Sequence, residues 1–126
     1  MALAGKDIVV QYKGRTVVGL NERITVHGPK GRRDVTARID TGATKSSIDV
    51  KLAADLQLGP ILKSKMIKSA SGNTLRPVIR TNIDISNKKI TSEFTLADRS
   101  HMKYSVLIGQ NILKENKFLV DPTKEE

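Results

Sequence analysis

The chain has 126 residues, 38% of them hydrophobic and 3% aromatic, with 22 basic against 13 acidic residues and a net charge of +9. This length fits one domain with one core, and the lack of cysteine excludes disulfides, thiol catalysis and a cysteine zinc site. No apolar run approaches the roughly 18 residues of a membrane span, and the N-terminus lacks the apolar segment of a signal peptide. We therefore expect a cytoplasmic protein, or a periplasmic one if a leader was removed.

Two short β-like runs open the chain, at residues 8–10 and 16–18. The Lys-Gly-Arg at residues 13–15 predicts a hairpin turn between them. We expect this hairpin, residues 7–20, to extend a core that spans about residues 22–121.

A second hairpin follows and ends at a carboxylate. Residues 23–27 alternate apolar and polar side chains, and the Gly-Pro-Lys-Gly at residues 28–31 is a dense turn signal. Residues 35–39 alternate again, with the period of a strand that buries one face. This strand would carry Asp40 to its end.

The residues after Asp40 permit catalysis, but they also suit an ordinary turn. Thr41 places a hydroxyl beside the carboxylate, and Gly42 lets the chain turn tightly because it has no Cβ. An acid held among backbone N–H groups and a hydroxyl is a plausible catalytic group. Asp followed by Gly is also ordinary turn chemistry.

The middle of the chain predicts a short helix and a long hairpin. Asp49 is a suitable N-cap for a helix that runs through Leu56 and stops before Gly59-Pro60. Residues 63–80 predict two strands about a tip of small residues at 69–73. In the strand that follows, Ile79, Thr81, Ile83 and Ile85 share one face, which predicts a half-buried antiparallel strand.

The C-terminal third adds buried strands and a second helix. Residues 106–108 form an apolar run that Gly109 interrupts, residues 110–116 have helical spacing, and residues 118–122 predict a last short strand. Residues 1–126 thus predict a single, mostly β domain with one or two short helices.

The charge leaves several partners open. Nucleic acid would suit a basic protein, but no nucleic-acid motif is present, and the four aromatic residues, Tyr12, Phe94, Tyr104 and Phe118, form no visible base-stacking platform. Nucleic acid is therefore the weaker prediction. Acidic peptides would explain the charge as well, and so would a solubilising surface.

Three features in this order resemble the retropepsin-type aspartic peptidases. They are the Asp-Thr-Gly-Ala at residues 40–43, the glycine-tipped hairpin, and the Val-Leu-Ile-Gly at residues 106–109. The resemblance covers about residues 22–121. It implies a closed β-barrel that acts as a homodimer, with the hairpin as a flap over the substrate and the apolar strand threaded behind the active loop.

A narrower resemblance is to a small prokaryotic retropepsin-like family once labelled ATP-dependent zinc proteases. Its members are associated with RimK-type ligases, which add glutamate tails to proteins. The resemblance implies a peptidase that processes such acidic tails, and the net charge would suit that substrate. It is carried by residues 37–47, 93–99, 106–109 and 119–122.

The residues do not support the label itself. The two histidines, His27 and His101, lack the His-Glu-x-x-His spacing of a zinc peptidase, and no Gly-x-x-x-x-Gly-Lys-Ser/Thr loop is present. We expect no metal and no cofactor, and we expect both histidines to be solvent-exposed.

An aspartic mechanism requires a second carboxylate. Two such groups share one proton, because two negative charges a few ångström apart cannot both stay ionised. The chain has one Asp-Thr-Gly, and Asp84, Asp98 and Asp121 are not followed by Thr-Gly. We therefore expect a two-fold homodimer in which each subunit supplies its Asp40.

The resemblance also implies roles for individual residues. Asp40, Thr41 and Gly42 would be catalytic, with Thr41 forming a cross-subunit hydrogen bond and Gly42 donating its N–H to the carboxylate. Where retroviral members have an acid and an arginine, this chain has Thr44 and Gln110. The expected substrate contacts are Ala43, Ser71, Gly72 and Asn73, with Lys68 and Arg76 as further candidates.

Two alternatives to a peptidase remain at this point. A catalytically silent retropepsin-like module that binds acidic protein tails would carry the same motifs. A nucleic-acid binder would show affinity with a steep salt dependence.

Overall fold

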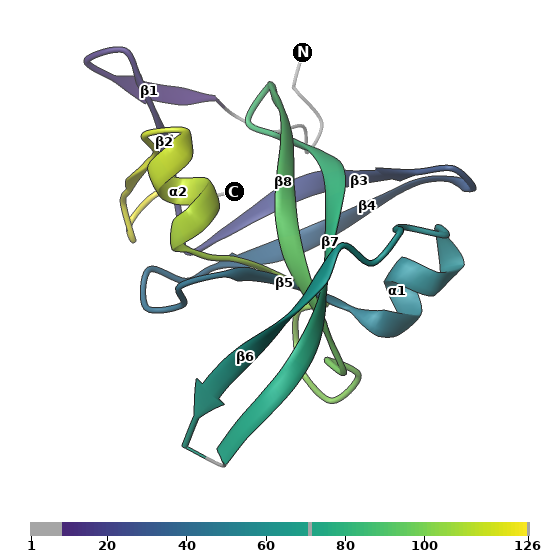
Figure 1. The fold of residues 1–126 in the computed structure, drawn as a ribbon. Coiled ribbons are helices and arrows are strands. Elements are labelled where there is room, and N and C mark those ends of the chain that lie inside the picture. The colour runs from purple at the N-terminus through teal and green to yellow at the C-terminus, as the bar shows by residue number, and fades with distance from the viewer. Residues whose placement is uncertain (1–8, 71, 126) are drawn as a thin grey trace.

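The alternating runs of the sequence form a closed β-barrel in the computed structural model, which describes residues 9–70 and 72–125 (Figure 1). Six strands form the barrel in the order β3-β4-β9-β5-β8-β7, which closes because β7 also pairs with β3. The elements are β1 (Val10–Tyr12), β2 (Arg15–Val18), β3 (Asn21–Gly28), β4 (Gly31–Ile39), β5 (Ser46–Asp49), α1 (Val50–Asp55), β6 (Lys63–Ser69), β7 (Gly72–Ile85), β8 (Lys88–Ala97), β9 (Val106–Ile108), α2 (Gln110–Glu115) and β10 (Leu119–Val120). The predicted mostly β barrel with two short helices is confirmed.

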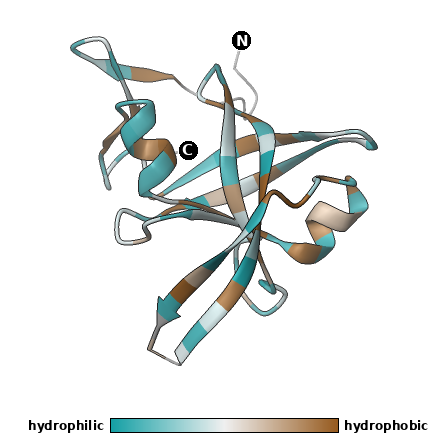
Figure 2. Ribbon diagram, in the orientation of Figure 1, coloured by the Kyte–Doolittle hydropathy of each residue, from teal (hydrophilic) through white to brown (hydrophobic). Residues whose placement is uncertain are grey.

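An aliphatic core fills the barrel. Along β7, Ile79, Ile83 and Ile85 are almost completely buried together with Thr81, because side chains on a strand alternate between its two faces. Figure 2 shows this alternation as bands of hydrophobic and hydrophilic residues along the strands. The predicted buried face of this strand is confirmed.

The first helix begins where the sequence predicts. The Asp49 side chain accepts hydrogen bonds from the backbone N–H groups of Lys51 at 3.1 Å and Leu52 at 3.4 Å, as an N-cap does. The helix ends at Asp55, several residues before Gly59-Pro60. Neither α1 nor α2, the helices among the described residues, has the length and hydropathy needed to span a bilayer.

The long hairpin has a shorter tip than the sequence suggested. Ser69 pairs with Gly72 and Lys68 with Asn73, so residues predicted to form the tip belong to the strands. β7 then continues without a break from this hairpin into the barrel. The hairpin of β6 and the first part of β7, here called the flap, therefore projects from the barrel as an extension of one of its own strands (Figure 1).

The two ends of the described chain lie together in a small second sheet. β1 and β2 form the predicted hairpin, and β10 pairs with β2 in parallel. Beyond β10, the Nζ of Lys124 lies 2.6 Å from the Oε2 of Glu22, and both side chains are more than 90% buried. The C-terminal strand is thus paired within its own chain.

His27 differs from the solvent-exposed histidine that the sequence suggested. It is half-buried on β3, and its Nε2 lies 2.8 Å from the Oδ2 of Asp84 on β7. These two strands close the barrel. The prediction failed because Asp84 is 57 residues away in the sequence, and only barrel closure brings the pair together.

This pair predicts a pH-dependent contribution to stability. The hydrogen bond from His27 lowers the pKa of Asp84 below its ordinary value, against the opposing effect of desolvation. The stabilisation that comes with a lowered carboxyl pKa is present above the unfolded-state pKa and is lost as the pH falls through the folded-state pKa. We expect Asp84→Asn to lower the free energy of unfolding by about 0.5–1 kcal/mol at neutral pH.

Urea denaturation of both proteins between neutral pH and about pH 2 measures this effect. The difference between wild type and Asp84→Asn should shrink below about pH 4, the ordinary pKa of an aspartate. A difference that stays constant across this range would contradict a role for the charged carboxylate.

Candidate active site

Asp40 lies at the end of β4, at the start of the loop that leads to β5. Its backbone N–H donates to the carbonyl of Ile108 on β9 at 2.9 Å, and its Oδ1 accepts the backbone N–H of Gly42 at 2.9 Å. The hydrogen bond predicted for Gly42 is therefore present. Asp40 is half-buried, while Thr41 and Gly42 are exposed, so the loop presents its hydroxyl and backbone to the outside.

Strand β9 and helix α2 support this loop from behind. β9 lies between β4 and β5 in the sheet, and the backbone N–H of Gln110 donates to the carbonyl of Ala43 at 2.7 Å. The Gln110 side chain donates through Nε2 to the carbonyl of Thr41 at 2.8 Å. Where retroviral members have an arginine in an ion pair, this chain thus has a neutral hydrogen bond, which reaches the Thr41 backbone and not Thr44.

A buried polar network that the sequence analysis missed fixes the far end of the loop. Asn111 accepts through Oδ1 from the backbone N–H of Ser46 at 3.0 Å and from its hydroxyl at 2.8 Å. The Ser46 hydroxyl oxygen in turn accepts the N–H of Gly109 at 2.9 Å. Since 65 residues separate Asn111 from Ser46, no local pattern could predict their contact. The one signal in the sequence was the position of Asn111 directly after Gly109 and Gln110.

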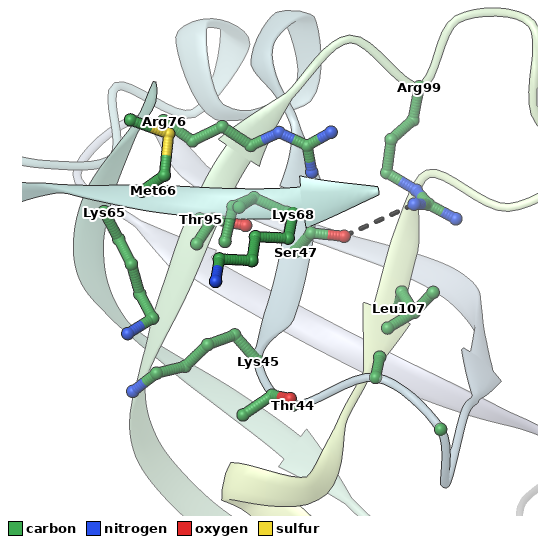
Figure 3. Close-up of a pocket in the computed structure, with 13 residues that line it drawn as sticks. Thr44, Lys45, Ser47, Lys65, Met66, Lys68, Arg76, Thr95, Arg99 and Leu107 are labelled. Atoms are coloured by element: carbon green, nitrogen blue, oxygen red, sulfur yellow. Dashed lines mark hydrogen bonds between the residues drawn. The ribbon is translucent and has the colours of Figure 1, made fainter. Parts of the chain in front are cut away.

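A cleft of about 490 Å³ separates the Asp40 loop from the flap (Figure 3). Of the predicted site residues, Gly42 and Ala43 line it, as do the candidates Lys68 and Arg76. The other lining residues are Thr44, Lys45, Ser47, Lys65, Met66, Ile67, Thr95, Arg99 and Leu107.

Several predicted residues lie outside the cleft lining. Asp40 does not line the cleft but accepts a hydrogen bond from Gly42, which does, and Thr41 lines a neighbouring groove together with Gln110. Gly72 and Asn73 lie at the exposed end of the flap, and Ser71 lies outside the described residues. Leu107, on the apolar strand expected behind the active loop, also contributes to the lining.

The lining is strongly basic. Five of its residues carry a positive charge: Lys45, Lys65, Lys68, Arg76 and Arg99. In Figure 3, the side chains of Lys65 and Lys68 extend from the flap toward the side of the cleft where Lys45 lies. No acidic residue is part of this lining among the residues that the structure describes, so the cleft favours anionic groups.

Arg99 is the most firmly held of these cations. Its Nε donates to the carbonyl of Tyr104 at 2.9 Å, and its Nη1 donates to the hydroxyl of Ser47 at 3.3 Å. Its backbone N–H donates to Asp49 Oδ1 at 2.7 Å. Burial lowers the pKa of Arg99, and the charge of Arg76 lowers it further, while Asp49 and Asp40 act in the opposite direction.

Neither histidine belongs to this cleft lining. His27 is paired with Asp84. His101 lies in the polar loop after β8 and is exposed, so the exposure predicted for this histidine is confirmed. Within residues 9–70 and 72–125, no three histidine or acidic side chains are grouped as metal ligands would be.

Comparison with known families gives one match over most of the chain. The model of the RimB-like family, described as "Retropepsin-like aspartic endopeptidase RimB", matches residues 51–126. This segment contains the flap, β9 and α2. It begins after the Asp-Thr-Gly-Ala of residues 40–43, so the match is independent of that motif.

One curated relative is named as a ligase. A probable alpha-L-glutamate ligase of Desulfotalea psychrophila is 33% identical over 64 residues, which make up 50% of this chain and 14% of that protein. The chain thus corresponds to a small part of that relative's length.

Solved structures with the same barrel include viral proteases. Protein Lpg0085 of Legionella pneumophila has a TM-score of 0.62 at 20% identity, with 86% of this chain and 94% of that chain covered. The EIAV protease, solved with an inhibitor, has a TM-score of 0.62 at 18% identity, with 84% and 93% covered. The simian foamy virus protease has a TM-score of 0.54 at 17% identity, with 75% and 91% covered. At these identities the likeness establishes the retropepsin-like fold.

Proposed function

The chain belongs to the RimB-like family of retropepsin-like aspartic endopeptidases, and from this premise we propose that it hydrolyses peptide bonds as a homodimer with one Asp40 from each subunit. The observation that carries the proposal is the position of Asp40. It ends a barrel strand beside the cleft, and its carboxylate accepts the N–H of Gly42. The proposed catalytic unit is a single domain over residues 1–126.

Four other aspartates of the described chain support the need for a second subunit. Asp49 caps α1, and Asp84 is paired with His27. Asp98 and Asp121 each accept hydrogen bonds from a residue two positions later. Since these groups are engaged elsewhere, the partner of Asp40 in our proposal is the Asp40 of a second copy.

The proposed mechanism needs no covalent intermediate. The ionised member of the pair takes a proton from a water molecule, which attacks the peptide carbonyl. The protonated member donates a hydrogen bond to that carbonyl and polarises it. Thr41, exposed on the loop, would bond across the two-fold axis and hold the two carboxylates together.

The proposed substrate is an acidic protein tail, such as a run of glutamates. Five basic residues line the cleft, and they would attract glutamate side chains. The similarity of this chain to part of a probable alpha-L-glutamate ligase is consistent with a role beside enzymes that handle glutamate.

Incubation of the protein with a peptide that ends in glutamates, and with its glutamine counterpart, tests the proposal by mass spectrometry of the products. We expect cleavage of the glutamate peptide, with a rate per subunit that rises with protein concentration as dimers form. Binding without cleavage at every concentration would favour the silent tail-binding module. A monomer at micromolar concentration in sedimentation would contradict the dimer.

A further inference from the structure

Four of the five basic side chains that line the cleft have no acidic partner among the described residues. Lys65, Lys68, Arg76 and Arg99 line the cleft, yet no carboxylate of the described residues forms an ion pair with any of them. Nearby cations outside this group are paired, since Lys45, Lys63 and Arg80 share Glu93. The cleft therefore holds positive charge that no carboxylate of residues 9–70 and 72–125 neutralises by an ion pair.

Part of this charge lies across the flap itself. Lys65 on β6 and Arg76 on β7 are direct cross-strand partners, so their side chains leave the same face of the hairpin. Like charges in this position repel each other. Arg76 also acts on Arg99, whose pKa it lowers, so repulsion extends from the flap to the barrel.

Arg99 is positioned to receive an anion. Two of its nitrogen atoms are fixed by Tyr104 and Ser47, whereas its Nη2 has no hydrogen-bond partner among the described residues. A guanidinium held in place loses little freedom when it binds a carboxylate. Figure 3 shows the Arg76 side chain extending from the flap on the side of the cleft where Arg99 lies.

We propose that the flap is closed by the charge of its ligand: Arg76 of the flap and Arg99 of the barrel bind one carboxylate of an acidic peptide between them, and without it their repulsion holds the flap open. This inference rests on the proposed function, because it takes the cleft as the substrate site. A negative charge between two positive ones turns repulsion into attraction. Closure would then depend on an acidic side chain, which couples substrate choice to formation of the closed site.

A carboxylate fits this site better than the phosphates of a nucleic acid. The lining contains no aromatic side chain among the described residues, and single-stranded nucleic acids bind largely by stacking their bases on such side chains.

Hydrogen exchange of the flap backbone tests the proposal. We expect pentaglutamate to slow exchange at residues 63–78 by about tenfold in Asp40→Asn, which leaves the peptide intact, and pentaglutamine to have little effect. Arg76→Gln and Arg99→Gln should each remove most of this protection. Arg76→Gln should also slow exchange in the free protein, because the repulsion is reduced.

Two controls distinguish the effect of the positive charges in the cleft from the effect of the positive net charge of the protein. Arg32→Gln removes an exposed arginine at the β3–β4 hairpin, outside the cleft lining, and should leave the protection unchanged. Raising the salt concentration in the unmutated protein should slow flap exchange without peptide and weaken protection with it. The salt experiment uses only the unmutated protein, so its result does not depend on whether a variant folds.

The results distinguish this inference from the proposed function. Equal protection by pentaglutamate and pentaglutamine would overturn charge-driven closure, even if the wild type cleaves peptides. Stronger protection by an oligonucleotide of equal charge would overturn the assignment of the site to a carboxylate. Protection by pentaglutamate alone, with no cleavage by wild type, would support closure and contradict the peptidase.

Discussion

The substitution Asp40→Asn is expected to reduce peptide hydrolysis by roughly 10²- to 10⁴-fold, the usual contribution of a general acid or base. The amide oxygen can still accept the Gly42 N–H that now reaches Oδ1 at 2.9 Å, so the loop should keep its shape. An amide cannot take a proton from water, and the chemistry should fail without loss of the fold. Cleavage of the glutamate peptide, measured at equal protein concentration, checks this.

Asp34→Asn is the matched control. It removes a carboxylate from the same strand, β4, where Asp34 is exposed and accepts a hydrogen bond from Thr25 at 2.7 Å. Its activity should equal that of wild type. Equal turnover by Asp40→Asn and Asp34→Asn would exclude Asp40 as a catalytic residue.

Mixtures of wild type and Asp40→Asn test whether both subunits contribute. If each site needs two intact Asp40 residues, an equal mixture with free subunit exchange should show about one quarter of the wild-type activity, because only one dimer in four is fully intact. If each chain acted on its own, the mixture would show about one half of the wild-type activity.

Gly109→Ala is expected to destabilise the protein by about 3 kcal/mol, at the upper end of the usual cost of overpacking. A Cβ there would lie 2.5 Å from the carbonyl oxygen of Lys45 and 2.8 Å from that of Ala43. These are backbone atoms of the loop that follows Asp40, so relief of the clash would displace this loop. Urea denaturation measures the loss, and activity of the folded fraction should fall with it.

Gly14→Ala separates this clash from backbone strain. Gly109 has φ −103°, which any residue adopts, so its requirement for glycine is steric. Gly14 has φ +78°, and a Cβ at this residue would have no neighbouring atom within 4 Å, so its replacement should cost only about 1 kcal/mol. If the Gly109 variant were no less stable than the Gly14 variant, close packing behind the loop would not be the reason for this glycine.

Local patterns predicted much of the fold. The period-two alternation of residues 79–85 predicted their buried face, and the Asp49 side chain marked the start of α1, because both depend on neighbours within a few residues. The tip of the flap was less well predicted, since small residues suit a turn and the end of a strand alike. In the structure Ser69 and Gly72 are paired.

The order of residues along the chain was enough to specify an aliphatic β-barrel and to place Asp40 at the end of one of its strands. Which side chains share the cleft with that loop depends instead on how distant strands pair. Arg76 lies on β7 and Arg99 follows β8, and both line the cleft because β7 closes the barrel and also forms the flap. Asn111 reaches Ser46 across 65 residues in the same way. Contacts between such distant residues depend on the register of the strands and on the closure of the sheet. A period-two pattern along one strand does not determine either of them.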